Sequence, residues 1–528
     1  MAQPVENAYD ALPYMSMAFP QSHPDRLAVI ARLFGMTTAP LARCRVLELG
    51  CASGGNLIPM ALSLPEASFL GIDLSARQIA DGKATIAKAG LSNVELRQMD
   101  IMDVDNALGT FDYIIAHGVF SWVPTHVQEQ LLRICAQHLA PSGVAYISYN
   151  TFPGWHMRGM IRDMMRYHVR SFPDATVRVQ QARALLDFLA QSVPTENNAY
   201  GIVLKGELEM LRKQNDSYLA HEHLEEVNSP VYFHEFAERA LARGLQFLGE
   251  AEFSTMLASN LPQQVSETLR KIAPDIVRME QYMDFVRNRP FRQTLLVHQG
   301  VTLSRNLDWK TMQGFRIGSN AKPVSATPDI VTNAREEFRH PWGMSVVTGD
   351  PIVKSAFMIL SERWPQTVPF EELCAKARAR LDQHPQAIAD PAAKARDVEL
   401  VGTEMLRCLA AVIVEVRIEP SPEVVVVSDR PLASAVARVQ AELGITMANL
   451  RHEPISLDEF NRNVVRLLDG RHDKAALIGD LAKLIDEKGM TIRRGDVPVT
   501  EPADVRAILE QVVPQSLEHL RKSAMLVA

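Results

Sequence analysis

The sequence predicts an α/β fold whose N-terminal part is a doubly wound, parallel sheet. Between residues 45 and 150, segments with strand and helix patterns alternate regularly, as in α/β proteins. The strand segments are rich in Val, Ile and Leu, which is typical of parallel strands buried on both faces. A glycine-rich turn, 50-GCASGG-55, links the first strand to the next helix. These three observations together define the predicted class.

The predicted elements follow one another in a simple order. A helix over residues 25–36 precedes the first strand, at residues 45–50. Helical periodicity then marks three segments, at residues 56–65, 75–90 and 125–140. Apolar runs between them predict four more strands, at residues 68–73, 93–100, 111–119 and 143–150. Two later strands, at residues 245–253 and 291–298, are expected to complete the same sheet.

The same patterns divide the chain into domains. Residues 1–154 and 231–300 are expected to form the sheet domain, and residues 155–230 form a helical insertion within it. Residues 301–350 are turn-rich and form a middle domain. Residues 351–528 form the C-terminal domain.

A winged helix is expected at the start of that C-terminal domain. Two helices flank the Trp364-Pro365 break, and a third follows over residues 401–413. Strands are then predicted at residues 414–418 and 423–428. Three helices followed by a two-stranded ribbon outline a winged helix, and the last hundred residues read mainly as helix.

Length and composition narrow the possible classes. A chain of 528 residues is expected to hold three or four domains. Its net charge of -7 argues against general binding to nucleic acid or anionic membranes. The five scattered cysteines, without a CxxC pair, predict reduced thiols and no cysteine-built zinc site. No signal peptide or membrane-spanning run is recognisable, so we expect a cytoplasmic protein.

The glycine-rich turn departs from a dinucleotide-binding loop. Such loops follow the pattern G-x-G-x-x-G, but Ala52 stands where the second glycine would let the backbone approach a pyrophosphate. S-adenosylmethionine carries no phosphate, so its loop tolerates this change. Its amino-acid end needs an acidic partner for the α-amine, and Glu48, at the end of the first strand, suits that role.

Side chains at the ends of the next strands suit the rest of this cofactor. Asp73 ends the second strand, where a carboxylate can accept hydrogen bonds from both ribose hydroxyls. Asp100 follows the third strand and is placed for the adenine amino group. After the fourth strand, 116-AHGVFSWVP-124 places polar and aromatic groups over the reactive end. We therefore predict a methyltransferase with these cofactor-binding residues: Tyr14, Glu48, Gly50, Ser53, Gly54, Asn56, Asp73, Leu74, Gln78, Asp100, Ile101 and His117.

Several motifs carry a family resemblance. The segments 48-ELGCASGGN-56, 71-GIDLSARQI-79 and 97-RQMDI-101 resemble motifs of class I S-adenosylmethionine-dependent methyltransferases, which have a Rossmann-like sheet. A fuller set resembles the bacterial methyltransferases that carry a methyltransferase regulatory domain: 116-AHGVFSWVP-124, 149-YNTFPGW-155, 221-HEHLEEVNSPVYF-233, 244-GLQFLGEAEF-253 and 449-NLRHEPISLDEF-460. Among these are the rickettsial protein-lysine methyltransferases of outer-membrane proteins. The resemblance covers nearly the whole chain.

The resemblance implies more than the residue patterns do. It implies a homodimer formed through the helical insertion, a middle domain and a C-terminal winged-helix domain. It also implies methyl transfer to lysine side chains of a protein, such as an outer-membrane protein. The Ala at position 52 departs from the general class I loop but is compatible with this subfamily.

A lysine acceptor must lose its proton before it attacks the methyl group, so a carboxylate or a water is needed nearby. Aromatic faces can attract the sulfonium and line a channel for an alkylammonium. Strand-end loops are the favoured place for such groups. On this basis, and on the resemblance for the last two, the candidate catalytic residues are Trp122, Tyr149, Asn150, Trp155, His221 and Glu222.

Two features were weighed against plainer interpretations. Tyr14 and Phe19 could belong to an N-terminal lid, although simple packing is favoured slightly. The run 221-HEHLEE-226 contains metal-ligand residue types, but no further ligand lies at a suitable spacing. A charged loop or helix end is favoured, and no metal is expected.

Alternative functions stay open at this point. The acceptor could be a small molecule methylated on nitrogen or oxygen. A winged helix could also make the protein a DNA-binding regulator, but its expected cations, Arg363, Lys376, Arg378 and Arg380, are partly balanced by neighbouring glutamates. A protein-interaction role is therefore favoured over nucleic acid. A scaffold that binds the cofactor without catalysis is the third alternative, against which Glu48, Asp73 and Asp100 argue.

Overall fold

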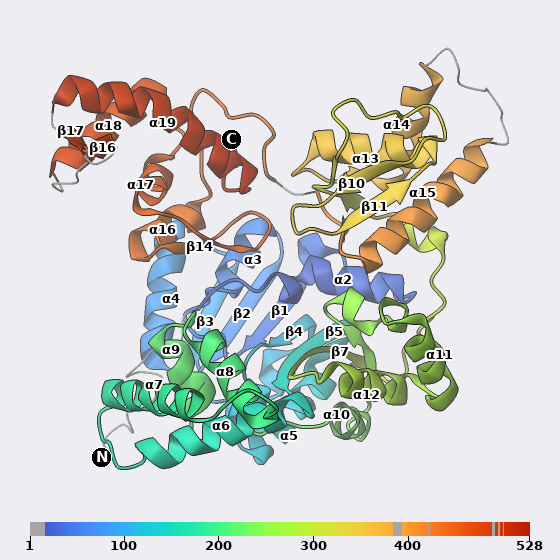
Figure 1. Ribbon diagram of the computed structural model, residues 1–528, viewed down its shortest axis with the longest axis vertical. Coiled ribbons are helices and arrows are strands. Elements are labelled where there is room, and N and C mark those ends of the chain that lie inside the picture. The colour runs from blue at the N-terminus through green and yellow to red at the C-terminus, as the bar shows by residue number, and fades with distance from the viewer. Residues whose placement is uncertain (1–15, 384–392, 421, 488–491, 495–496, 500) are drawn as a thin grey trace.

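The computed structural model describes residues 16–383, 393–420, 422–487, 492–494, 497–499 and 501–528 (Figure 1). Its centre is one seven-stranded sheet with the order β3-β2-β1-β4-β5-β7-β6. The strands are β1 (Arg45–Leu49), β2 (Ser68–Asp73), β3 (Val94–Gln98), β4 (Phe111–Ala116), β5 (Leu139–Asn150), β6 (Leu245–Glu250) and β7 (Phe291–His298). The predicted α/β class is confirmed, and both late strands join the sheet as expected.

The sheet is mixed, although its first five strands are parallel as predicted. β7 runs antiparallel to β5 and to β6. The other pairs, β1 with β2 and β4, β2 with β3, and β4 with β5, are parallel. The carboxyl ends of β1 to β5 therefore meet along one edge, which is where open α/β sheets bind ligands.

Helices cover both faces of the sheet because successive strand residues point to opposite sides. Val46 and Leu47 on β1 belong to two different hydrophobic clusters. The Val46 side packs with α2 (Pro24–Leu33), α3 (Leu57–Ser63) and α4 (Ala76–Ala89). The Leu47 side packs with α5 (Thr125–His138) and α10 (Phe233–Leu241).

The predicted helical insertion lies between β5 and α10. It consists of α6 (Gly154–Val169), α7 (Ala175–Ser192), α8 (Ala199–Leu211), α9 (Asp216–Leu219) and a π-helical turn, η6 (Ala220–Leu224). These helices form their own hydrophobic cluster and lie below the sheet in Figure 1. Two more helices, α11 (Gln263–Ile272) and α12 (Ile276–Arg287), precede β7.

The segment after β7 forms a second body. It contains β8 (Arg316–Gly318), β9 (Lys322–Pro323), β10 (Glu336–Arg339), β11 (Ser345–Thr348), α13 (Pro351–Arg363), β12 (Val368–Pro369), α14 (Phe370–Asp382), α15 (Ala393–Ala410) and β13 (Glu415–Arg417). Phe338 on β10 stacks on Phe357 of α13, with ring centroids 5.2 Å apart. The segments before and after residue 350 therefore share one core.

The ribbon predicted at residues 414–428 is wrong in its second half. β13 forms within residues 414–418, but residues 423–428 contain no strand. Val424 and Val427 instead pack, partly buried, against the C-terminal hydrophobic cluster. A run of valines favours a strand only where a neighbouring strand offers hydrogen bonds.

The C-terminal body has a separate core made by residues between Ala433 and Leu526. Its elements are α16 (Ala435–Leu443), β14 (Thr446–Ala448), β15 (Pro454–Ser456), α17 (Glu459–Leu467), α18 (Lys474–Glu487), β16 (Ile492–Arg494), β17 (Val497–Val499) and α19 (Pro502–Lys522). A two-stranded ribbon, β16–β17, follows three helices here. Across the described residues, no helix combines the length and apolar character needed to cross a bilayer.

Candidate active site

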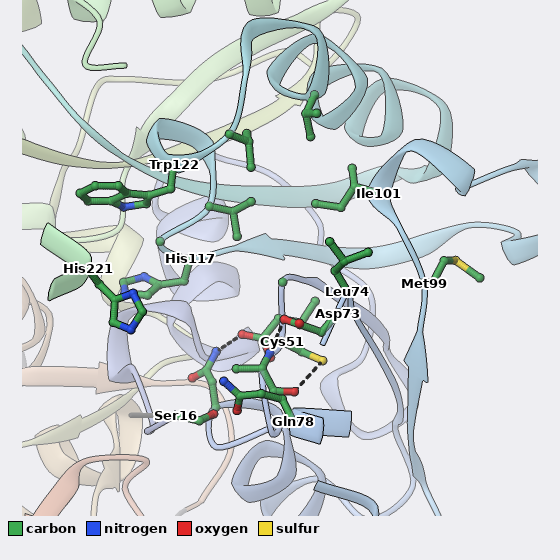
Figure 2. Close-up of a pocket in the computed structure, with 18 of the residues that line it drawn as sticks. Ser16, Cys51, Asp73, Leu74, Gln78, Met99, Ile101, His117, Trp122 and His221 are labelled. Carbon is green, nitrogen blue, oxygen red and sulfur yellow. Dashed lines mark hydrogen bonds between the residues drawn. The ribbon is translucent and has the colours of Figure 1, made fainter. Parts of the chain in front are cut away.

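A cavity of about 360 Å³ opens at the carboxyl ends of β1 to β4 (Figure 2). The strand-end loops supply most of its wall. Residues 16, 17 and 19 of the N-terminal segment and residues 221 and 222 of η6 supply the rest. In Figure 2, Leu74, Met99 and Ile101 lie at one end, and His117, Trp122 and His221 lie at the other.

The glycine-rich turn is tight because three of its residues, Gly50, Ala52 and Gly54, adopt left-handed conformations. Gly50 has a φ of +73°, and a Cβ atom there would lie 2.5 Å from the Val119 side chain. The N–H groups of Gly50 and Cys51 both donate to the Ile72 carbonyl, at 2.9 and 3.0 Å. Ala52 has a φ of 49°, which costs an Ala residue on the order of 1 kcal/mol. Its N–H donates to Asp73 Oδ2 at 2.8 Å, which holds the strained turn in place.

Glu48 is buried at the end of β1, with 3% of its surface exposed. Its Oε1 accepts a hydrogen bond from Asn56 Nδ2 at 2.7 Å. Its Oε2 is buried and has no hydrogen-bond partner among the described residues. Burial raises the pKa of Glu48 to about 8, and the nearby charge of Asp73 adds to this effect. A carboxylate oxygen of this kind fits an α-ammonium group, which would satisfy it and restore its charge.

Asp73 ends β2 and lines the cavity. Its Oδ1 accepts from the Ser75 N–H at 2.9 Å, while Oδ2 accepts from Ala52. A carboxylate at the end of this strand is placed to accept hydrogen bonds from ribose hydroxyls. Asp100 follows β3 and accepts the Met102 N–H at 2.9 Å. These strand ends fit the nucleoside part of S-adenosylmethionine.

The end of the cavity away from Asp73 and Asp100 has a more apolar wall. Trp122, Val123, Pro124 and Val127 line it from the segment after β4, and His221 and Glu222 face it from η6. π-helical turns are found frequently at functional sites. Burial raises the pKa of half-buried Glu222 to about 7, although Arg158 opposes the shift. Glu222 is therefore a carboxylate able to exchange a proton near neutral pH.

His117 lies at the same end of the cavity as Trp122 and His221. Phe19 stacks on its ring at a centroid distance of 3.7 Å, and its Nδ1 lies 2.8 Å from the Tyr146 hydroxyl. Burial lowers the pKa of His117 to about 3, so the imidazole is neutral at physiological pH.

The structure brings most of the predicted residues to the cavity wall. From the cofactor set these are Glu48, Gly50, Asn56, Asp73, Leu74, Gln78, Asp100, Ile101 and His117. From the catalytic set they are Trp122, His221 and Glu222. Ser53 and Gly54 shape the turn but do not line the cavity. Tyr14 lies outside the described residues.

Three of the predicted catalytic residues do not lie on the cavity wall. Tyr149 points to the opposite face of the sheet, where it stacks on Phe236 and bonds to the Thr294 hydroxyl at 3.0 Å. Asn150 donates through its side chain to Asn228. Trp155 is 1% exposed and packs edge-on against Trp122, at a centroid distance of 6.3 Å. Tyr149 and Trp155 are therefore packing residues, and Trp155 supports Trp122 from behind.

Some wall residues had no clear signal in the sequence. Ser16 and Met17 belong to the N-terminal segment that crosses the glycine-rich turn. The Gly55 N–H donates to Ser16 Oγ at 2.7 Å, and a Cβ at Gly55 would lie 2.4 Å from the Ser16 backbone. A glycine is therefore needed at position 55 because another segment passes close to it. The glycine at position 55 is thus the local sequence feature that is consistent with the contact between Ser16 and the glycine-rich turn.

Three family models match the chain in sequence order. Residues 46–143 match a methyltransferase domain, residues 215–298 a predicted methyltransferase regulatory domain, and residues 429–525 the PKMT C-terminal winged helix domain. The winged helix therefore lies at α16–α19, after the segment where the sequence pattern had placed its start. With the sheet and the cavity, these matches define a class I S-adenosylmethionine-dependent methyltransferase.

Two similarities over the full length specify the family. An uncharacterized protein of Rickettsia prowazekii is 36% identical over 530 residues, which cover 99% of this chain and 94% of that protein. The structure of PKMT2 from Rickettsia typhi in complex with AdoHcy matches with a TM-score of 0.87 and 31% identity, over 98% of this chain and 100% of that one. This chain belongs to the same family of methyltransferases, those with a regulatory domain and a PKMT winged helix, and S-adenosylmethionine is its cofactor.

Proposed function

We propose that this methyltransferase acts on lysine side-chain amines of a protein substrate, with outer-membrane proteins as the first class to test. The observation that carries the proposal is Glu222, a carboxylate with its pKa raised to about 7, at the apolar end of the cavity. The winged-helix model and the Rickettsia typhi structure also carry the designation PKMT, for protein-lysine methyltransferase.

The apolar end suits a lysine chemically. Trp122, Val123 and Val127 offer surfaces for an alkyl chain and disfavour the charged ammonium by desolvation. Glu222, when ionised, accepts the proton that the ammonium loses. The cofactor, when bound, supplies a methyl group on a sulfonium. The neutral amine then forms the new N–C bond as the S–C bond breaks, and the chain's task is to hold amine and methyl in line.

The structure also bears on the choice of partner. The cations that the sequence pattern assigned to a DNA-reading face lie in α13 and α14, outside the winged helix at α16–α19. Three of them are also paired with carboxylates: Lys376 with Glu372, Arg378 with Asp397 and Arg380 with Glu362. Paired cations release few counterions from DNA and contribute little to binding it. DNA binding through these cations is therefore not supported, and a protein substrate stays the proposal.

We propose in addition that the helical insertion forms a homodimer interface. Its helices α6, α7 and α8 expose apolar side chains, including Tyr167 at 68%, Phe188 at 62% and Ile202 at 60%. Exposed apolar groups in this number mark interaction surfaces. Light scattering after size exclusion should give a dimer for the parent chain and a monomer for Phe188→Arg. Leu443→Arg, at an equally exposed site on α16, is the matched control and should stay dimeric.

Methyl acceptors can be identified directly. Purified protein is incubated with isotope-labelled S-adenosylmethionine and a fractionated lysate that includes membrane proteins, and the label is mapped by mass spectrometry. Label on lysine side chains is the expected result. Label confined to small molecules would assign a metabolite acceptor instead. No label, despite cofactor binding, would favour a non-catalytic role.

A further inference from the structure

A turn of the C-terminal domain reaches into the cofactor site of the N-terminal domain. The turn spans residues 449–453, and its fourth residue, His452, is 4% exposed with a φ of 62°. Asn449 Oδ1 accepts the N–H groups of Arg451 at 2.9 Å and Glu453 at 2.8 Å, which fixes the turn. His452 Nε2 lies 2.8 Å from the side-chain oxygen of Asn56, 396 residues earlier in the chain.

Asn56 is fully occupied by hydrogen bonds. Its Oδ1 lies 2.9 Å from the Phe19 N–H and 2.8 Å from His452 Nε2. Ser22 Oγ also lies 3.2 Å from Oδ1, but its one proton can be donated to the Phe19 carbonyl, at 2.8 Å. Its Nδ2 donates to Glu48 Oε1 at 2.7 Å and to Ser22 Oγ at 3.0 Å. An amide offers two acceptor positions and two N–H donors, so each is used.

These contacts fix which way the amide faces. The Phe19 N–H can only donate, and the Glu48 carboxylate, when ionised, can only accept. His452 must therefore carry its proton on Nε2 and donate to Asn56. Burial lowers the pKa of His452 to about 3, so the ring is neutral and suits this single-donor role.

The bonded amide in turn orients Glu48. Asn56 holds Oε1 and leaves the buried Oε2 as the atom without a described partner. That atom is the one that fits the α-ammonium of the cofactor. Two short hydrogen bonds between buried side chains therefore connect His452 to the carboxylate of Glu48. The first joins His452 to Asn56, and the second joins Asn56 to Glu48.

The rest of the C-terminal domain keeps the turn in place. α16 packs against α3 and α4 of the sheet domain. Lys88 on α4 forms an ion pair with Glu442 on α16, at 3.0 Å. Arg451, next to His452, pairs with Glu415 and Glu423 and stacks on Trp364. The turn is thus anchored to both other bodies of the molecule.

We propose that His452 is a positioning residue of the cofactor site, through which the winged-helix domain sets the affinity for the amino-acid end of S-adenosylmethionine. Removal of its donor leaves one lone pair of Asn56 unsatisfied and lets the amide turn, so Glu48 loses its orientation. The proposal rests on cofactor binding and is independent of the acceptor proposed above.

The test compares two ligands by calorimetry on the full chain. AdoHcy has the amino-acid end, whereas 5′-methylthioadenosine keeps only the nucleoside and the sulfur. His452→Leu keeps apolar bulk without a donor, and should raise the Kd for AdoHcy about tenfold or more. The Kd for 5′-methylthioadenosine should change less than twofold. His452→Gln, whose amide can donate in place of the ring, should restore AdoHcy binding to within about threefold of the parent.

Two controls separate positioning from loss of structure. Lys88→Ala breaks the ion pair of the same domain contact but leaves His452 in place, and should not change either Kd. In an Asn56→Ala background, His452→Leu should have no further effect, because the two residues act in series. Equal losses for both ligands, an equal loss in Lys88→Ala, or unchanged AdoHcy binding in His452→Leu would each overturn the proposal.

Discussion

The two ends of the cavity are built in different ways. The cofactor end consists of strand ends, where Glu48 and Asp73 are held by short hydrogen bonds to nearby backbone and side chains. The apolar end, which we propose binds the acceptor and call the acceptor end, combines the segment after β4 with η6 of the insertion, about 100 residues later. Trp122 and Glu222 meet there only because the insertion folds back onto the sheet.

This difference indicates which end of the cavity should determine cofactor affinity and which should determine methyl transfer and substrate choice. The sheet fixes the cofactor end before any ligand arrives, so it should control cofactor affinity. The acceptor end is carried by a loop and a π-helical turn, so it should control methyl transfer and the choice of substrate. Substitutions at the cofactor end should then leave kcat nearly unchanged, and substitutions at the acceptor end should leave the Kd for the cofactor nearly unchanged.

The largest effect is expected at Glu222. Glu222→Gln should lower kcat by roughly 100-fold or more, because general-base groups contribute about 10²–10⁴-fold. The pKa of Glu222 is about 7, and the ionised form accepts the proton, so kcat of the parent should rise as pH rises through 7 and then level off. The variant should lack this rise.

Steady-state rates at saturating cofactor, measured from pH 5.5 to 9, provide the check. Exposed Glu226→Gln on the same segment is the control and should keep both the rate and the pH profile. A Glu222→Gln variant with weakened AdoHcy binding but normal kcat would contradict the division between the two ends.

Asp73 should give the next largest effect, now on binding. Asp73→Ala removes acceptors for both ribose hydroxyls and for the Ala52 N–H. Hydrogen bonds to a charged group contribute about 1.5–3 kcal/mol each, so the Kd for AdoHcy should rise at least about 100-fold. Calorimetry measures this directly, with exposed Asp103→Asn as the control. Unchanged affinity would remove Asp73 from the cofactor site.

Glu48→Gln should weaken AdoHcy binding by about 10–100-fold while stabilising the cofactor-free protein. The folded pKa of about 8 lies above the ordinary value of 4.5, chiefly because of burial. At pH values between 4.5 and 8, the Glu48 side chain is ionised in the unfolded chain but holds a proton in the folded protein. Parent stability therefore falls as pH rises from 4.5 to 8, and the Gln variant escapes this loss.

Thermal unfolding without ligand is the measurement for Glu48. The Tm of Glu48→Gln minus that of the parent should be small at pH 5, increase up to pH 8 and stay constant above it. Exposed Glu66→Gln should show no such trend. A variant that is less stable than the parent at pH 8.5 would mean that Glu48 is ionised and satisfied without ligand.

The smallest effect is expected at Ala52. Ala52→Gly relieves the left-handed strain, but Gly also makes the unfolded chain more flexible, at about 0.4–1 kcal/mol. Stability should change by less than about 1 kcal/mol, and the Kd for AdoHcy by less than threefold. Ala52→Val is the contrast, because a β-branched residue tolerates this φ poorly and should destabilise the turn. Denaturant unfolding and calorimetry measure both variants.

The sequence predicted which strand-end residues line the cavity, because these signals are local. β1, β2 and β4 are short, mainly apolar segments, and Glu48, Asp73 and Asp100 stand at or just after strand ends. The topology then brings such ends to one edge. The strand predicted at residues 423–428 failed because its valines depend on a partner strand that local sequence cannot supply.

The acceptor end was harder to predict for the same reason. Tyr149 follows Ser148 on β5, and adjacent residues face opposite sides of the sheet. Ser148 Oγ accepts the Gly118 N–H on the cavity side at 2.8 Å, so Tyr149 must face the other core. Glu222 was identified through family motifs, since nothing in a helical run marks a π-helical turn. The link from His452 to Asn56 spans 396 residues and has no local signal.

The placement of η6 has a consequence for how this family diversifies. The insertion lies between β5 and α10, and its core is separate from the cores on the two faces of the sheet. Changes of sequence or length within residues 154–224 can therefore alter the part of the cavity wall formed by His221 and Glu222 without altering the strand ends that line the cavity. We therefore expect relatives that differ mainly in this segment to bind the same cofactor but to differ in the acceptor that they methylate.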